Sequence, residues 1–259
     1  MKITVLVENT SRSQDLMCEH GLSLYIQTAH ANILFDAGQT DAFARNASLL
    51  GVDLSKADCM VLSHGHYDHG GGVATFLSLN PTAPVYVTPA AFGDYYDKEG
   101  KYIGLNKSLQ DHPRVVRVEH GFSPAPDCCL VGASQMPCAF PVVHGGLVVA
   151  TPKGAREDDF CHEQYLIVEE EGERVVFTGC AHKGVLNILS WLCPQKIMGG
   201  FHLMHTPCGG EDLLRVEREL SRFDCVYATG HCTGQEQSRL LAGALPELTV
   251  LATGDVLEW

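Results

Sequence analysis

Three histidines and one aspartate lie within six residues of this chain, in the pattern His-x-His-x-Asp-His. They are His64, His66, Asp68 and His69, and they directly follow the apolar run Cys59–Leu62. A buried strand that ends in a turn can direct several side chains toward one point, so this spacing predicts converging donors. Imidazole and carboxylate are common ligands of zinc, and core packing gives no reason to crowd so many polar rings together. The segment therefore predicts a metal site, and the density of donors indicates more than one metal ion.

The composition predicts a globular protein with an acidic surface. The chain has 259 residues, of which 45% are hydrophobic and 19% charged, and it contains 26 glycines, as expected of a core with many loops. We expect a single domain over residues 1–259. An elaborated region at about 92–146, where five prolines interrupt short apolar runs, is expected to cover the site.

The net charge of −13 restricts the partners. An acidic surface argues against nucleic acid or an anionic membrane surface as the main partner. We expect a small-molecule substrate, and an anionic substrate fits as well, because bound metal ions reverse the local charge. The sequence leaves the oligomeric state open.

Several features predict a cytoplasmic location. No apolar run reaches membrane-spanning length, and the segment Met1–Glu8 is typical of a first strand and lacks a signal-peptide cleavage pattern. The eleven cysteines have no framework spacing. They fit a reducing compartment, where thiols serve as small core residues or metal ligands.

Apolar periodicity predicts a strand-rich first part and alternating strands and helices in the last third. The expected strands are Ile3–Val7, Leu22–Gln27, Ile33–Phe35, Met60–Leu62, Val85–Val87, Gln164–Glu169, Arg174–Thr178, Lys196–Met198, Cys225–Ala228 and Leu248–Ala252. The expected helices are Asp41–Leu50, Lys183–Leu192, Glu211–Arg222 and Gln235–Ala244, with another just after His69. This order suits two mixed sheets with helices outside them.

Further donors follow three of the later strands. Cys180 and His182 come after one strand, His202 after the next, and His231 after the one beyond. Because functional sites gather where strand ends meet loops, we expect these residues to join the first motif. We expect His182 and His202 to bind the substrate, and His182 to act as a catalytic proton donor to the leaving group. The alternative for both is a helix cap or a hydrogen bond to a loop carbonyl.

Together these elements resemble the metallo-β-lactamase superfamily. The resemblance rests on Asp36 after a strand, the motif from His64 to His69, the segment Thr178-Gly179-Cys180 and the late Gly230-His231. It implies an α/β fold, namely a four-layer αββα sandwich of two mixed β-sheets with two metal ions at one edge. The metals implied are two zinc ions, with iron or manganese as the alternatives.

The resemblance also implies a ligand set. His64 and His66 would bind the first metal, and Asp68, His69 and His231 the second. Cys180 would lie at or between the metals, where the superfamily usually has an aspartate. Asp36 would orient a ligand histidine.

One ligand of the first metal is not fixed by these motifs. The superfamily supplies it shortly before the strand that precedes Cys180, in the region of Asp158–Gln164. We choose His162, with Asp159 as the main rival. His144 is a weaker choice, because it lies further from the strand.

A narrower resemblance, to the branch of the archaeal dihydropterin–ribofuranosylaminobenzene phosphate synthase of methanopterin synthesis, is spread over nearly the whole chain. It adds Glu8-Asn9, Gly199-Gly200-Phe201-His202 and His231-Cys232-Thr233-Gly234 to the matching segments. Many relatives in that branch are described only as metal-dependent hydrolases. The resemblance therefore implies the fold and the metal site more strongly than the substrate.

The predicted function is that of a dinuclear zinc hydrolase. A metal-bound hydroxide would attack an ester, thioester, lactone or phosphoester, and Asp68 would orient the nucleophile and take its proton. The first alternative is a transferase that joins a pterin-methyl group to an arylamine. The second is a metal-binding sensor without catalysis, although the histidine-rich site is unlike paired cysteine knuckles.

Overall fold

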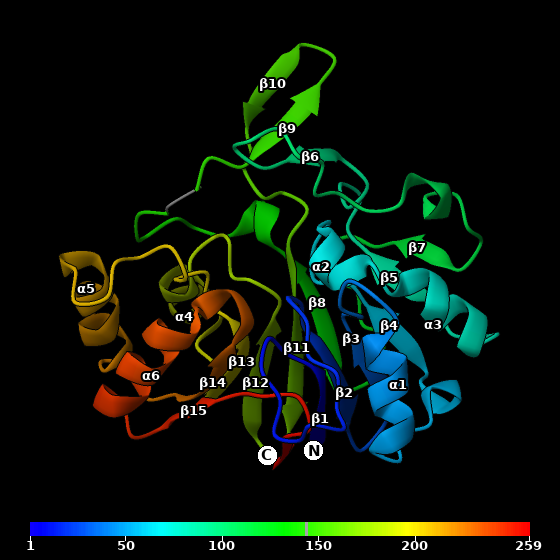
Figure 1. The fold of residues 1–259 in the computed structure, drawn as a ribbon, viewed down its shortest axis with the longest axis horizontal. Coiled ribbons are helices and arrows are strands. Elements are labelled where there is room, and N and C mark those ends of the chain that lie inside the picture. The colour runs from blue at the N-terminus through cyan, green and yellow to red at the C-terminus, as the bar shows by residue number, and fades with distance from the viewer. Residues whose placement is uncertain (143–144) are drawn as a thin grey trace.

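Two β-sheets stack face to face between two layers of helices (Figure 1). The computed structural model describes residues 1–142 and 145–259. Helices α1 (Ala42–Leu49) and α3 (Val73–Leu79) cover one outer face. Helices α4 (Val185–Leu192), α5 (Glu211–Leu220) and α6 (Gln235–Ala244) cover the other. The predicted αββα sandwich is thus confirmed.

The first sheet has the strand order β16-β1-β2-β3-β4-β5-β7 within the described residues. Its members are β1 (Lys2–Val7), β2 (Ser23–Gln27), β3 (Asn32–Phe35), β4 (Cys59–Val61), β5 (Val85–Val87), β7 (Val115–Arg117) and β16 (Val256–Glu258). Strands β1 to β3 pair antiparallel, whereas β3, β4, β5 and β7 pair parallel. The sheet is therefore mixed, as predicted.

The second sheet is also mixed, with the order β15-β14-β13-β12-β11-β8 in the part of the chain that is described. Its members are β8 (Cys128–Gly132), β11 (Gln164–Glu170), β12 (Glu173–Thr178), β13 (Lys196–Gly200), β14 (Val226–Gly230) and β15 (Leu248–Val250). Strands β12 to β15 run parallel to one another, and β11 pairs antiparallel with β12 and β8.

Alternating side chains of the strands fill separate apolar layers. In β3, Ile33 and Phe35 pack between the two sheets, and Leu34 packs on the opposite side with Phe43 and Phe76 of the helices. All five side chains are fully buried. Side chains that alternate along a strand thus point into two different apolar layers. Both faces of the strand are buried, which explains why these strands are apolar throughout.

The region from about 92 to 146 contributes strands to three sheets. Strands β7 and β8 lie at the edges of the two main sheets, while β6 (Asp94–Tyr96) pairs with β9 (Val148–Thr151), which pairs with β10 (Gly154–Glu157). This small sheet lies above the sandwich (Figure 1). Tyr95 of β6 packs against the His162 ring, with ring centroids 4.0 Å apart. The small sheet therefore covers one side of the histidine motif, while the single-domain organisation stays a prediction.

The predicted elements agree with the structure except near some ends. Helix α6 and strand β5 match at both ends. Helix α4 begins two residues later than predicted, because Gly184 has φ of +87°, which a right-handed helix cannot include. A short helix, α2 (Tyr67–Gly70), contains Asp68 and His69 of the histidine pattern, and α3 is the helix expected just after His69.

Parallel pairing brings the carboxyl ends of several strands to one edge. Phe35 of β3 is opposite Val61 of β4, and Thr178, Gly199 and Thr229 are in register across β12, β13 and β14. The loops that follow these strands carry Asp36, the histidine motif and the later histidines. Among the helices of the described chain, none combines the length and apolarity that a membrane span requires.

Candidate metal centre

Most of the predicted metal ligands, together with His182, form two adjacent groups at this edge. The first group consists of His64, His66 and His182, whose candidate ligand atoms all lie within 4.8 Å of one another. The second group consists of Asp68, His69, Cys180 and His231, and it meets the same limit. The rings of His64 and His69 connect the groups, with centroids 4.2 Å apart. Donors separated by more than 160 residues therefore converge, as predicted.

The first donor group is made of neutral imidazoles. All three rings are at most 4% exposed. Four ring nitrogens of this group have no hydrogen-bond partner among the described residues. They are His64 Nε2, His66 Nε2 and both ring nitrogens of His182. Buried polar atoms without partners are rare in proteins and demand an explanation, of which an ion is one. These nitrogens fit a metal that prefers imidazole, such as zinc.

Burial and crowding keep these imidazoles uncharged. Burial is the largest cause that lowers the pKa of His64 well below its ordinary value, and the neighbouring His69 and His66 lower it further. Burial likewise lowers the pKa of His66 and of His182, with contributions from His162 and His202 respectively. A neutral ring keeps a lone pair for a cation, so the first group is held in its ligand form.

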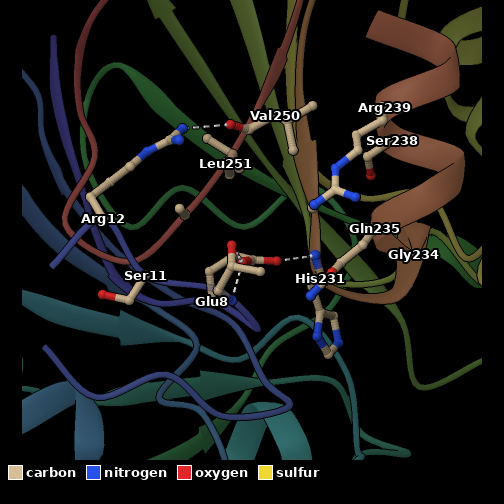
Figure 2. Close-up of a pocket in the computed structure, with 13 residues that line it drawn as sticks. Glu8, Ser11, Arg12, His231, Gly234, Gln235, Ser238, Arg239, Val250 and Leu251 are labelled. Atoms are coloured by element: carbon tan, nitrogen blue, oxygen red, sulfur yellow. Dashed lines mark hydrogen bonds between the residues drawn. The ribbon is translucent and has the colours of Figure 1, made fainter. Parts of the chain in front are cut away.

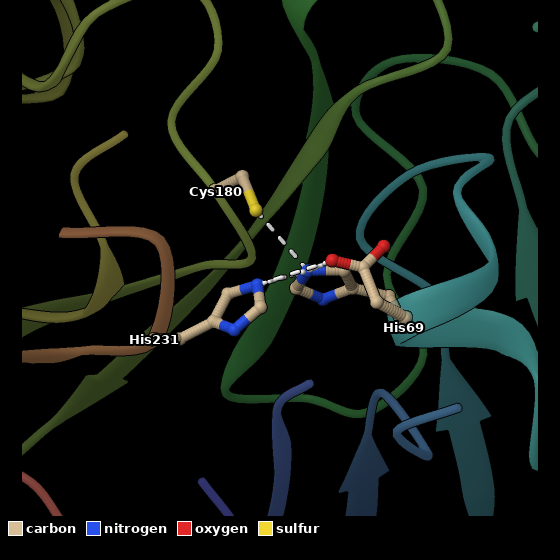
Figure 3. A group of neighbouring side chains, drawn as sticks. His69, Cys180 and His231 are labelled. Atoms are coloured by element: carbon tan, nitrogen blue, oxygen red, sulfur yellow. Dashed lines mark hydrogen bonds and ion pairs between the residues drawn. The ribbon is translucent and has the colours of Figure 1, made fainter. Parts of the chain in front are cut away.

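The second donor group combines three types of ligand atom (Figure 3). His69 Nε2 lies 3.1 Å from Cys180 Sγ and 3.1 Å from His231 Nε2. Asp68 Oδ2 lies 3.3 Å from His231 Nε2. All four residues are at most 8% exposed. Imidazole, carboxylate and thiolate together form a donor set that suits zinc.

Asp36 holds both groups in place. Its carboxylate lies 2.6 Å from His69 Nδ1 and accepts 2.7 Å hydrogen bonds from the Ser63 backbone N–H and hydroxyl. Ser63 Oγ in turn lies 2.8 Å from His64 Nδ1. These contacts fix the Nδ1 side of both rings, so each Nε2 faces the cluster. This is the orienting position predicted for Asp36.

The charge of Asp36 also affects His69. Burial lowers the pKa of His69, but the negative charges of Asp36 and Asp68 outweigh it and raise the pKa to about 9. Without a cation the ring is therefore protonated. A bound cation would replace that proton at Nε2, because the proton on Nδ1 is held by Asp36.

Two N-terminal residues hold His231 from the other side. Asn9 Oδ1 lies 3.0 Å from His231 Nδ1, and Glu8 Oε1 accepts a 2.6 Å hydrogen bond from the His231 backbone N–H (Figure 2). Both residues belong to the segment Glu8-Asn9 that the narrower resemblance singled out. The first strand and the last third of the chain thus meet at this histidine.

Glu163 is a functional candidate that the sequence reasoning missed. Its buried carboxylate accepts hydrogen bonds from the backbone N–H groups of His182 (2.8 Å) and Lys183 (3.1 Å) and from the Tyr165 hydroxyl (2.7 Å). Burial raises the pKa of Glu163. A glutamate directly before a strand of buried residues was the available signal, because a carboxylate is seldom buried without a partner.

The backbone is strained where the donors emerge. Asp36, Ala181, His202 and His231 have φ values of +59°, +51°, +52° and +50°, which residues other than glycine seldom adopt. Gly179 also has no room for a side chain, since a Cβ there would lie 2.1 Å from Ser63 Oγ. Such strain is typical of functional sites, where side-chain direction outweighs backbone preference.

His162 has protein partners on both ring nitrogens. Nδ1 accepts a 2.9 Å hydrogen bond from the Gly65 N–H, and Nε2 lies 3.0 Å from Asp158 Oδ2. The candidate ligand atoms of His162, His66 and Asp158 also lie within 4.8 Å of one another. These contacts nevertheless favour His182 over His162 as the partner of His64 and His66. The choice of His162 as a metal ligand stays a prediction.

The rivals to His162 lie elsewhere. The Asp159 side chain is 45% exposed and forms a 2.8 Å ion pair with Arg156, so it does not join the donor groups. His144 lies outside the described residues. His20 also lies near the second donor group, with Nε2 3.4 Å from Asp68 Oδ2 and its ring 4.7 Å from that of His231.

A pocket of about 260 Å³ opens beside the donors, between α4 and α5. His182 and His202 lie at one end of it, and their rings are 4.3 Å apart. Its walls are largely apolar and include Val185, Leu203 and Val216. The pocket therefore offers space for an organic group next to the candidate metal centre.

Comparison with known proteins agrees with this geometry. A model of the metallo-beta-lactamase superfamily matches residues 17–134. An uncharacterized protein from Methanocaldococcus jannaschii (MJ0448) is 27% identical over 243 residues, which cover 90% of each chain. From the same organism, 7,8-dihydropterin-6-methyl-4-(beta-D-ribofuranosyl)-aminobenzene-5'-phosphate synthase is 23% identical over 267 residues, covering 90% of this chain and 88% of the relative.

Solved structures lead to the same family. The crystal structure of Tm1679, described as a metal-dependent hydrolase of the beta-lactamase superfamily, matches with a TM-score of 0.86 at 27% identity, covering 100% of this chain and 99% of that one. Zn(2+)-bound PqqB from Methylobacterium extorquens shares the fold with a TM-score of 0.61 at 12% identity, over all of both chains. The family model, the motifs and the solved relative described as a beta-lactamase superfamily hydrolase all agree with the resemblance to the metallo-β-lactamase superfamily.

Proposed function

We propose that this protein is a metal-dependent hydrolase with two metal ions, which the donor chemistry favours as zinc. The observation that carries the proposal is the adjacency, at one sheet edge, of two of the four overlapping candidate donor groups among the described residues. His64, His66 and His182 would hold one ion, and Asp68, His69, Cys180 and His231 the other. Two bound zinc ions would supply an activated water and polarise a carbonyl or phosphoryl oxygen of the substrate.

The residues around the ions would then have distinct roles. Asp68 would orient the nucleophile and take its proton. Its Oδ2 lies within 3.4 Å of both His20 and His231. His202 lines the pocket, and its Nδ1 has no partner within the described residues. We assign the substrate contact and the proton for the leaving group to His202. His182, predicted for both roles, is assigned here to the metal.

The pocket favours one part of the predicted substrate range. Its apolar walls suit a substrate whose non-reacting part is an acyl chain or an aromatic ring. Arg215 at the pocket is paired with Asp212 at 3.1 Å, which reduces its use for an anion. Among esters, thioesters, lactones and phosphoesters, we therefore propose carboxylic esters, thioesters or lactones first.

The test combines metal analysis with an activity panel. Protein purified without chelator is expected to contain two equivalents of zinc and to hydrolyse at least one substrate of a panel of these four classes. His66→Ala should lose one equivalent and the activity, whereas His30→Ala, a change in an exposed loop, should keep both. Activity of His66→Ala in metal-depleted form equal to that of the wild type would contradict the proposal.

A second candidate reaction is transfer of a pterin-methyl group to an arylamine. It is supported by the relative whose name is that of a pterin-related synthase. Mass spectrometry of metal-loaded protein with a pterin-methyl pyrophosphate and an arylamine would detect the coupled product. Coupling without hydrolysis would favour this candidate, and bound metal without turnover in either assay would favour a sensor.

A further inference from the structure

A second pocket, of about 300 Å³, is lined by His231 and by residues outside the donor groups (Figure 2). Its walls come from the N-terminal segment Glu8–Arg12, the start of α6 and the segment Val250–Ala252. Neither the catalytic proposal nor the motifs use Arg12, Ser238 or Arg239, which line it. The volume lies at the lower end of the range for small-ligand pockets.

The pocket presents hydrogen-bond donors that have no acceptor. Arg239 extends into it from α6 (Figure 2), and its guanidinium has no ion pair within residues 1–142 and 145–259. Ser238 is 1% exposed, and its hydroxyl has no hydrogen-bond partner in the described chain. A buried hydroxyl that lacks a partner and lines a pocket is explained by a ligand that accepts its proton.

Another element adds donors, whereas Arg12 is already engaged: it donates to Asp255 through Nε (2.8 Å) and Nη2 (3.0 Å) and to Val250 O through Nη2. Gly234 precedes the ten-residue helix α6 and has no side chain to cap it. The N–H groups of the first turn are therefore available to an anion, which the helix dipole also favours.

The carboxylates at the pocket are already engaged. The Glu8 carboxylate accepts hydrogen bonds from the His231 N–H, the Thr10 N–H and the Thr10 hydroxyl, at 2.6, 2.6 and 2.7 Å. Asp255 is occupied by Arg12. A complementary ligand must therefore bring several acceptor oxygens and need few acceptors in return, which describes a phosphate group.

We propose that this pocket binds a phosphate-bearing small molecule, with its phosphate between Arg239, Ser238 and the start of α6. The proposed phosphate position does not use the donor groups, of which His231 alone lines the pocket, and it does not depend on hydrolysis. The segment Val250–Ala252 would contact any organic part of the ligand. The same phosphate chemistry could come from inorganic phosphate or from a phosphate monoester.

Isothermal titration calorimetry of the metal-loaded protein tests the site, with phenyl phosphate and inorganic phosphate as probes. Arg239→Ala should weaken binding at least about tenfold and Ser238→Ala several-fold, as expected when a donor to a charged group is lost. Arg218→Ala, an exposed arginine on α5, should have no effect. Tighter binding of phenyl phosphate would indicate a monoester, and equal binding would indicate free phosphate.

Two controls separate this site from its surroundings. Phosphate held by the metal ions would still bind to Arg239→Ala, so only the binding that this variant removes is assigned to the pocket. Ser238→Ala should keep the wild-type unfolding midpoint, because the hydroxyl has no partner to lose. The proposal is overturned if both variants bind the probes as the wild type does, or if neither probe binds the wild type.

Discussion

The two donor groups are built differently, although they adjoin. In the first group, buried nitrogens of His64, His66 and His182 lack partners in the described chain. In the second group, the donors contact one another, and Asp36 and Asn9 fix two of the rings. The difference teaches that the first group, although Ser63 contacts His64 Nδ1, depends on a cation for the contacts of its four unpartnered ring nitrogens. The second is arranged in advance by hydrogen bonds from outside.

Metal removal should have the largest effect. Chelation is expected to abolish hydrolysis, because no other group at the site could activate water to the same extent. It should also destabilise the first group most, since its nitrogens would then stay buried without partners. Atomic absorption and thermal unfolding, before and after zinc is restored, measure both effects. Full activity in a preparation without metal would break the comparison.

The next largest effect is expected from substituting the candidate ligands of the first group. His182→Ala should remove one equivalent of metal together with the activity. His162→Ala should keep the metal but lose about 1–3 kcal/mol of unfolding free energy, because the Gly65 N–H and Asp158 lose a partner. Metal content and denaturant unfolding of both variants decide between the two histidines. The opposite pattern would restore His162 as the ligand.

A smaller effect is expected from substituting Asp36, the residue that orients His69 in the second group. Asp36→Asn should weaken metal affinity about 10–100-fold, because the carboxylate no longer orients His69. Asp111→Asn, at an exposed position, is the matched control. Competition with a chromophoric chelator gives the affinity. Unchanged affinity in Asp36→Asn would show that the second group is not arranged in advance by this contact.

The smallest change should come from Asn9→Ala. Its amide contacts His231 Nδ1 at 3.0 Å without a charge of its own, so the loss should stay below about tenfold in metal affinity. The same competition assay measures it. A loss larger than that of Asp36→Asn would reverse the order of the two supports and so refine the comparison.

The sequence predicted the regular elements well where their patterns were long. Helix α6 and strand β5 match at both ends, and β13 and β14 continue two residues further, through the glycines that lead to His202 and His231. Strands β6 to β10 and β16 were missed. Short edge strands have too few residues for a reliable period, and their pairing is decided by the sheet they join.

Most predicted site residues lie close together, but the sequence did not reveal the role of every residue at the site. The motif from His64 to His69, Cys180 and His231 converge as expected, since parallel strands end at one edge. Glu163 was missed because its partners are backbone N–H groups of a loop that is distant in sequence. Such contacts leave no periodic pattern in the chain.

The sequence by itself determined the chemistry that is available: a dense histidine motif, strands that end in donors, and a family resemblance. The tertiary structure alone decided which imidazoles stand together. His162 and His182 both lie close to the donor groups. The ring nitrogens of His162 contact Gly65 and Asp158, whereas those of His182 have no hydrogen-bond partner among the described residues. The physical reason is that a ring nitrogen's partners depend on strand register and local φ. Spacing along the chain does not encode either one.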